Sequence, residues 1–193
     1  MVKGEGTVKT VYILLSKTGT FPSRVIHFLK GGPFTHASFS FVPSTEHFYS
    51  YARRNPKNFL VAGLIMENLH TDVFAHYKNC RCALYSLEVS EEDYGKMQEL
   101  VNYYLHHYKQ ASYNMLGMPL LGLGIRVRRK YKLTCSQFVA LILNCAKQIK
   151  LPKDPYLMLP NDFVKVKDLA LLYDGPIKDC TCHAFRMAEP VVS

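Results

Sequence analysis

Apolar and polar residues alternate along much of the first half of the chain, and this alternation predicts strands. Over 36–42, Ala37, Phe39 and Phe41 fall on one face, whereas His36 and the serines between them fall on the other. This is the two-residue repeat of a strand. Further runs rich in apolar and β-branched residues predict strands over 9–16, 46–51, 60–69, 82–89 and 169–173.

Helices are predicted mainly in the second half. Ser90 is followed by three acidic residues, which is typical of a helix start, and this helix is expected to reach about Tyr108. The segment from Cys135 to Gln148 is apolar nearly all round, which is typical of a buried helix. Shorter helices are predicted over 23–30, over 112–121 and from Pro160 onwards. A meander of strands with long helices after it favours an α+β fold, in which helices pack on an antiparallel sheet.

The length of 193 residues fits a single domain. We assign this domain to residues 1–175 and expect an irregular tail over 176–193, where no periodicity is found. No run approaches the roughly 18 apolar residues that a membrane-spanning helix needs, and the apolar stretch 11–15 is too short for a signal peptide. We therefore expect a cytoplasmic protein whose six cysteines are thiols rather than disulfides.

The charge of the chain favours anionic partners. It carries 24 basic and 15 acidic residues, a formal net charge of +9. The sequence contains no phosphate-binding glycine loop, dinucleotide fingerprint or nucleic-acid module. We therefore expect no cofactor and no nucleic-acid partner.

The sharpest chemical signal is the segment 133–138. Thr134 fits the N-cap of the following helix, and Gln137 then occupies the third helical position, which makes a capping box. Cys135 becomes the first helical residue, where free backbone N–H groups and the helix dipole stabilise a thiolate. The basic segment from Arg126 to Lys132 acts in the same direction. A small, buried and inert cysteine is the alternative, and the spacing alone does not decide between the two.

A thiolate nucleophile needs a base, which is most often histidine. Of the eight histidines, His36 differs from the rest because it opens a strand directly after a Gly-Gly-Pro-Phe-Thr turn. Such a position is rigid and can still face a cleft. The alternative for a single histidine on a strand is a structural residue.

Four segments, taken in chain order, resemble those of the circularly permuted NlpC-type branch of papain-like enzymes. This branch includes the YiiX-like hydrolases and their lecithin:retinol acyltransferase relatives. The segments are Thr35-His36-Ala37-Ser38, Phe48-Tyr49-Ser50-Tyr51-Ala52-Arg53, Thr134-Cys135-Ser136-Gln137-Phe138-Val139 and Leu159-Pro160-Asn161-Asp162-Phe163. The resemblance spans about residues 11–173. It implies a permuted papain-like fold, with an antiparallel sheet or barrel packed against the buried helix that carries Cys135.

The resemblance also implies the roles of the site residues. Cys135 would be the nucleophile, its backbone N–H would help to form the oxyanion hole, and His36 would be the base that later protonates the leaving group. For the group that orients His36, we favour Glu67 over Ser50, because a carboxylate also stabilises the imidazolium. His47 is a third candidate.

The expected activity is that of a cysteine hydrolase, an amidase or peptidase that cleaves an amide, peptide or ester bond. Its substrate is expected to be a small peptide, amide or lipid-like molecule that contacts Thr35, Ser136 and Tyr51. The acyltransferase relatives carry Asn-Cys-Glu-His at the nucleophile, and Thr-Cys-Ser-Gln at 134–137 departs from this pattern. A thiol acyltransferase or phospholipase is therefore the first alternative. A non-catalytic module that binds an anionic surface through residues 126–132 is the second.

Two further features have less specific interpretations. The pairs Cys80/Cys82 and Cys180/Cys182, with His183, offer zinc ligands. Their Cys-x-Cys spacing also fits strand edges, so no metal is expected. The basic segment 126–132 lies next to the apolar segment 115–125, which leaves a weak contact with a membrane surface as an alternative to a solvated loop.

Overall fold

The protein has an α+β fold built on one antiparallel sheet. The computed structural model describes residues 7–17, 32–55, 58–71, 74, 80–107, 112–113, 120–121, 123–126, 128 and 131–188. Six strands pair in the order β4-β3-β2-β1-β5-β8. They are β1 (Val8–Lys17), β2 (His36–Ser40), β3 (Phe48–Asn55), β4 (Asn58–Glu67), β5 (Arg81–Ser90) and β8 (Ala170–Pro176). All five neighbouring pairs in this sheet are antiparallel.

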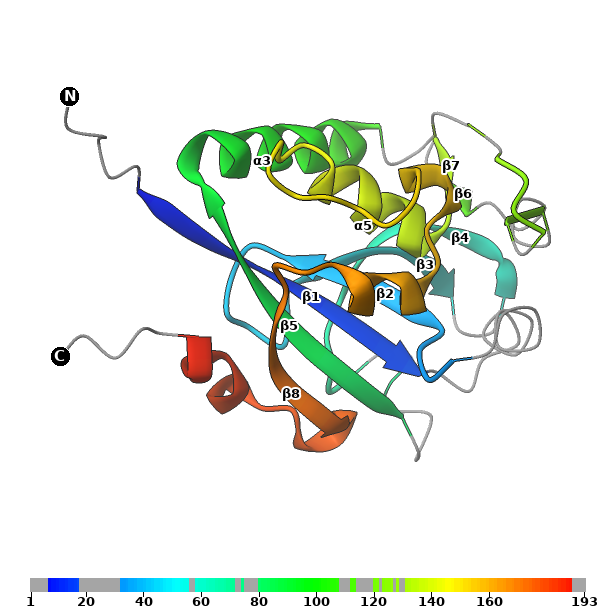
Figure 1. Cartoon of the computed structure of the whole chain (residues 1–193). Coiled ribbons are helices and arrows are strands. Elements are labelled where there is room, and N and C mark those ends of the chain that lie inside the picture. Colours follow the sequence, from blue (N-terminus) through cyan, green and yellow to red (C-terminus); the bar gives the residue numbers. More distant parts are fainter. Residues whose placement is uncertain are drawn as a thin grey trace, which may run out of the picture.

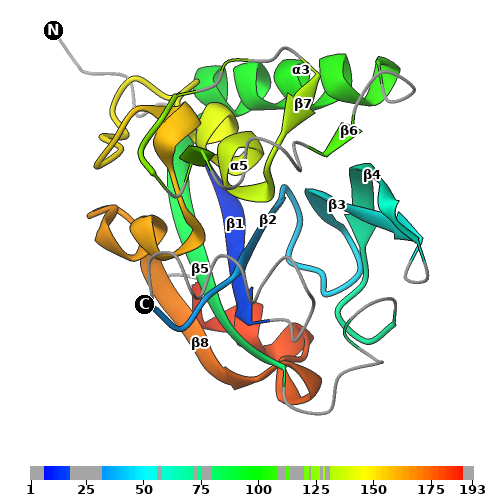
Figure 2. The ribbon, with the colours of Figure 1, turned by 90° about the vertical axis from the view of Figure 1, so that its right-hand side faces the viewer.

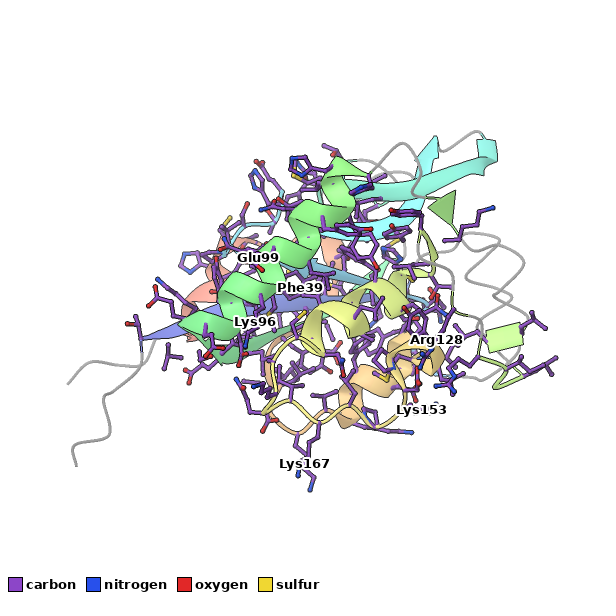
Figure 3. The ribbon with its side chains drawn as sticks, turned by 90° about the horizontal axis from the view of Figure 1, so that it is seen from above. Phe39, Lys96, Glu99, Arg128, Lys153 and Lys167 are labelled. Carbon is purple, nitrogen blue, oxygen red and sulfur yellow. The ribbon has the colours of Figure 1, made fainter. Side chains whose placement is uncertain are left out.

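Two helices cover one face of the sheet. They are α3 (Glu91–His106) and α5 (Cys135–Leu143), and Figures 1 and 2 show both on the same side of the strands. Viewed from above in Figure 3, they lie over the sheet, with Phe39 of β2 labelled between them. Phe39 is wholly buried in the core under these helices.

The middle of β1, residues 11–15, is apolar throughout because it is buried on both faces. Val11, Ile13 and Leu15 belong to the core under the helices, whereas Tyr12 and Leu14 belong to a second core on the opposite face. Alternate side chains of a strand point to opposite faces. A strand covered on both sides therefore reads as a continuous apolar run rather than as an alternation.

The C-terminal segment closes the second core. The sequence predicts an irregular tail from Pro176, but the structure has two 3-10 helices there, η3 (Ile177–Asp179) and η4 (Cys182–Ala188). Phe185 is buried and packs edge-on against Tyr12 of β1, with ring centroids 5.0 Å apart. Such short turns carry too few residues to produce a readable period, which is why the sequence pattern misses them.

The predicted strands all appear, with ends shifted by at most a few residues. The predicted helix over 112–121 is wrong at its start, where Ser112–Tyr113 forms strand β6, parallel to β7 (Lys132–Leu133). The helix predicted over 135–148 stops at Leu143, and the start at Pro160 is the 3-10 helix η2 (Pro160–Lys165), which follows η1 (Pro155–Leu157). The predicted helix over 23–30 lies outside the described residues.

Among the helices in the described ranges, none is both long enough and apolar enough to cross a membrane.

Candidate active site

Cys135 is the first residue of α5, and side-chain hydrogen bonds fix this end of the helix. The Thr134 hydroxyl accepts a hydrogen bond from the Gln137 backbone N–H at 3.3 Å. In return, the Gln137 side-chain oxygen accepts one from the Thr134 N–H at 3.0 Å. This is the predicted capping box. The Gln137 amide nitrogen also donates to the Tyr156 carbonyl at 2.9 Å, so the side chain is fully engaged in holding the helix.

The rest of α5 anchors the thiol in the core. Eight of the nine residues of the helix are buried. Phe138 packs against the rings of Tyr51 and Tyr104, with centroids 5.2 Å and 5.8 Å away. A nucleophile carried by such a helix is held by packed side chains rather than by a loop.

His36 opens β2 at a place where the edge of this strand is free to receive the thiol. The β2–β3 ladder registers the pair Phe39–Tyr49, beyond the first residues of β2. The backbone N–H of Ala37 donates a hydrogen bond to the Cys135 sulfur. The start of β2 thus lies beside the start of α5, and this brings Cys135 next to His36.

Glu67, at the end of β4, lies against the His36 ring. Its two carboxylate oxygens are 2.9 Å and 3.1 Å from His36 Nε2. Both residues are buried, with 9% of His36 and 4% of Glu67 exposed. The Cys135 side chain also hydrogen-bonds to His36. The three side chains thus form a chain of contacts in the order Cys135, His36, Glu67.

The charges within this chain of contacts shift the pKa of both members of the Cys–His pair. Burial alone lowers the pKa of His36, but attraction to Glu67 and Cys135 and the hydrogen bonds to both raise it well above its usual value. Burial alone raises the pKa of the Cys135 thiol, but attraction to His36, its hydrogen bond and the Ala37 N–H lower it. Both shifts favour a thiolate paired with an imidazolium.

The other two candidates for the orienting group do not contact His36. Ser50 is wholly buried on β3, and its hydroxyl has no hydrogen-bond partner within the described part of the chain. His47 bonds through Nδ1 to the Ser44 hydroxyl at 3.1 Å in an exposed turn. Among Glu67, Ser50 and His47, the carboxylate is thus the group that lies against the ring.

The three residues expected to contact substrate face the protein interior. Thr35 bonds through its hydroxyl to the Ser16 carbonyl at 3.4 Å, and Ser136 donates to the Met158 carbonyl at 2.6 Å. Tyr51 is wholly buried in the aromatic cluster under α5. Their packing and hydrogen bonds account for them as supports of the site, and their contact with a substrate stays a prediction.

Asn161 of η2 is a supporting residue to which the sequence analysis assigns no role. Its side-chain oxygen accepts from the Phe34 N–H at 3.0 Å, and its amide nitrogen donates to the Phe34 carbonyl at 2.8 Å. The segment that leads into His36 is therefore tied to η2. Gly32 fits against this side chain with a φ of +101°, and a Cβ there would lie 2.5 Å from Asn161 Cγ. The segment 159–163 carries part of the resemblance, but nothing in its pattern indicates a partner 127 residues away.

The Cys-x-Cys pairs lie away from this site. Cys80, Cys82 and Cys180 are buried in the second core, whereas Cys182 is exposed. A hydrogen bond donated by the Cys82 thiol to the Cys180 sulfur raises the pKa of Cys82 and lowers that of Cys180. Within the described ranges, no group of three or more His, Cys, Asp or Glu side chains is placed to hold a metal ion.

Comparison with known proteins adds no assignment, since no family model matches the chain and no curated protein matches its sequence.

Proposed function

We propose that this protein is a cysteine hydrolase of the permuted papain-like kind, which cleaves an amide, peptide or ester bond through an acyl-enzyme. The observation that carries the proposal is the chain of contacts Cys135–His36–Glu67 with the thiol at the start of a buried helix. A nucleophile, a base and a group that orients the base, in hydrogen-bonding reach of one another, are what covalent catalysis requires.

In the first half of the proposed reaction, the Cys135 thiolate attacks the carbonyl carbon of the substrate and a C–S bond forms. The bond to the leaving group then breaks as the His36 imidazolium gives its proton to the leaving amine or alkoxide. In the second half, water gives a proton to His36 and attacks the thioester. The C–S bond breaks, the acid product leaves, and the thiolate–imidazolium pair is restored.

The start of α5 supplies a donor for the negative charge that develops on the carbonyl oxygen. The first backbone N–H groups of a helix have no partner within the helix. The Cys135 N–H is therefore suited to bind the oxyanion. The Gln137 side chain is not proposed as a second donor, because its amide nitrogen already donates to the Tyr156 carbonyl.

Glu67 is proposed to act on the ring of His36. Its carboxylate holds Nε2, which leaves Nδ1 available to the thiol, and its charge stabilises the imidazolium. A cytoplasmic location belongs to the same proposal. Cys135, and the adjacent pair Cys82 and Cys180 in the second core, are free thiols, and thiols persist in reduced form in that compartment.

The test is acylation by p-nitrophenyl acetate, a small activated ester. We expect a burst of p-nitrophenol and a mass increase of one acetyl group, which peptide mapping places on Cys135. Cys135→Ala abolishes both, whereas the matched control Cys145→Ser retains both. Acetylation at another residue, or a burst that survives in Cys135→Ala, contradicts the proposal.

The same experiment separates hydrolysis from acyl transfer. A hydrolase releases acetate even when an amine acceptor is added. Transfer of most acetyl groups to the added amine would instead indicate a thiol acyltransferase, which forms the same acyl-enzyme.

A further inference from the structure

A cavity of about 500 Å³ opens at the end of the sheet where β1 ends and β5 begins. Its walls come from the end of β1, the start of β5, β8, η2 and the segment that precedes β2. The volume lies within the range of about 300–1,000 Å³ that is typical of small-molecule sites.

Two walls of the cavity are linked to His36 through neighbouring backbone residues. Phe34 lines the cavity and lies two residues before His36, a separation of at most about 7 Å along an extended chain. Asn161 also lines it and holds Phe34 by two hydrogen bonds. Lys17, on the β1 side, follows Ser16, which faces His36 in the β1–β2 register.

Cations dominate the polar part of the cavity. Lys17, Arg81 and Lys165 line it, against one carboxylate, that of Asp174. Asp174 is 3.3 Å from the Arg81 guanidinium, so this carboxylate is already paired. Neither lysine is neutralised by a cavity carboxylate, which leaves both available to an anion.

The two lysines differ in how they are held. In the described part of the chain, Lys17 has no carboxylate within ion-pair distance, and it stands opposite Arg81 in the β1–β5 register. Lys165 reaches Asp162 only at 3.9 Å, whereas Lys153 holds the same carboxylate at 2.8 Å. Asp162 is thus satisfied without Lys165.

Part of the remaining wall is apolar. Phe34 and Val164 both line the cavity. A bare, hydrated inorganic anion gains nothing from such walls. An organic anion gains from both parts, since its charge meets the lysines and its carbon skeleton meets the apolar surface.

We propose that this cavity binds the carboxylate-bearing part of the substrate, and that the protein acts on acylated amino acids or short peptides with a free carboxylate. That the bound molecule is a substrate rests on the proposed function. The binding site itself is inferred from the cavity alone. Lys17 and Lys165 contact the carboxylate, and the apolar walls contact the side chain next to it.

The binding test uses Cys135→Ala, which holds ligands without reaction, and calorimetry with N-acetylleucine, N-acetylleucinamide and inorganic phosphate. We expect N-acetylleucine to bind and the neutral amide, which lacks only the charge, to bind at least about tenfold more weakly. Lys17→Gln and Lys165→Gln each weaken N-acetylleucine by about two- to fivefold, the range for exposed ion pairs. Lys167→Gln is the matched control, because Lys167 is exposed, lies outside the cavity lining and points outward at the edge of the molecule in Figure 3.

Three outcomes would overturn the inference. They are equal binding of the acid and the amide, equal weakening by Lys167→Gln, and tighter binding of phosphate than of N-acetylleucine.

A competition experiment links the cavity to the reaction. N-acetylleucine, as a competing ligand or substrate, is expected to slow the release of p-nitrophenol from p-nitrophenyl acetate by the wild-type protein, and the Lys17→Gln/Lys165→Gln variant is expected to lose this inhibition. If N-acetylleucine binds without inhibiting, the cavity is not part of the substrate site and the inference fails while the hydrolase proposal stands. If Cys135 is never acetylated, the proposed function fails, and the calorimetry on Cys135→Ala still decides whether the cavity binds carboxylates.

Discussion

Replacing Glu67 with Gln removes one charge from the centre of the site and keeps the shape of the side chain. In the wild-type protein, His36 Nε2 lies 2.9 Å and 3.1 Å from the two carboxylate oxygens. The Gln oxygen can still accept a hydrogen bond from this nitrogen. Glu67→Gln therefore tests the charge, and Glu67→Ala tests charge and orientation together.

The expected direction follows from the causes of the two pKa shifts. Attraction to Glu67 is foremost among the effects that raise the pKa of His36 against burial. Without it, burial lowers the pKa of His36, the ring becomes neutral at lower pH, and the Cys135 thiolate loses the attraction that lowers its own pKa. The direct repulsion between Glu67 and the thiolate is the least of the effects on Cys135, so its loss does not compensate. The pKa of Cys135 therefore rises.

The size of the effect follows from burial. The side chains of His36 and Glu67 are 11% and 5% exposed, so solvent screens their attraction little. Exposed ion pairs contribute about 0.2–1 kcal/mol. We expect the attraction within this buried pair to be larger than that. We therefore expect Glu67→Gln to weaken the Cys135 thiolate by more than about 1 kcal/mol, the upper end for exposed pairs. On the low-pH limb of the reactivity profile, this is a fall of at least about fivefold in the alkylation rate.

The assay is the rate of Cys135 alkylation by iodoacetamide as a function of pH, followed by peptide mass mapping. Cys182 is exposed and serves as an internal reference for reagent activity. The low-pH limb of the wild-type profile is expected to move to higher pH in Glu67→Gln. Ser50→Ala, a buried change on β3, is the matched control and should leave the limb in place. Superimposed profiles for Glu67→Gln and wild type, or a shift in Ser50→Ala alone, would refute the reasoning.

Three further predictions concern reactivity and stability. A limiting dose of iodoacetamide at neutral pH should modify Cys135 faster than Cys145, because burial raises the pKa of both thiols but His36 reverses this for Cys135; equal labelling in a peptide map would contradict it. Asn161→Ala removes both hydrogen bonds to the Phe34 backbone and should lower the free energy of unfolding by about 1–3 kcal/mol in urea titrations, whereas an unchanged midpoint and slope would show that the tie is dispensable. Phe138→Ala empties the centre of the aromatic cluster and should cost about 3–5 kcal/mol, seen as a lower Tm by calorimetry; a loss below about 1 kcal/mol would mean that the core refills the space.

The local geometry of Cys135 follows from the sequence alone. The capping box joins Thr134 and Gln137, three residues apart, so its hydrogen bonds depend on one turn of helix and on nothing distant. That turn places Cys135 at the start of α5. The strand at His36 was equally readable, because the alternation of its residues is a property of adjacent positions.

The groups that meet those two residues depend on the packing of distant segments. Glu67 is 31 residues from His36, and their contact depends on how β2, β3 and β4 are registered and curved. Sequence reasoning favoured Glu67 over Ser50 for its charge, but both side chains lie on strands of the same sheet and no local pattern separates them. The Asn161–Phe34 tie and the cationic cavity span even longer separations. Hydrogen bonds within one helical turn are fixed by neighbours in the chain, whereas contacts between strands and distant turns are fixed by the packing of the whole sheet.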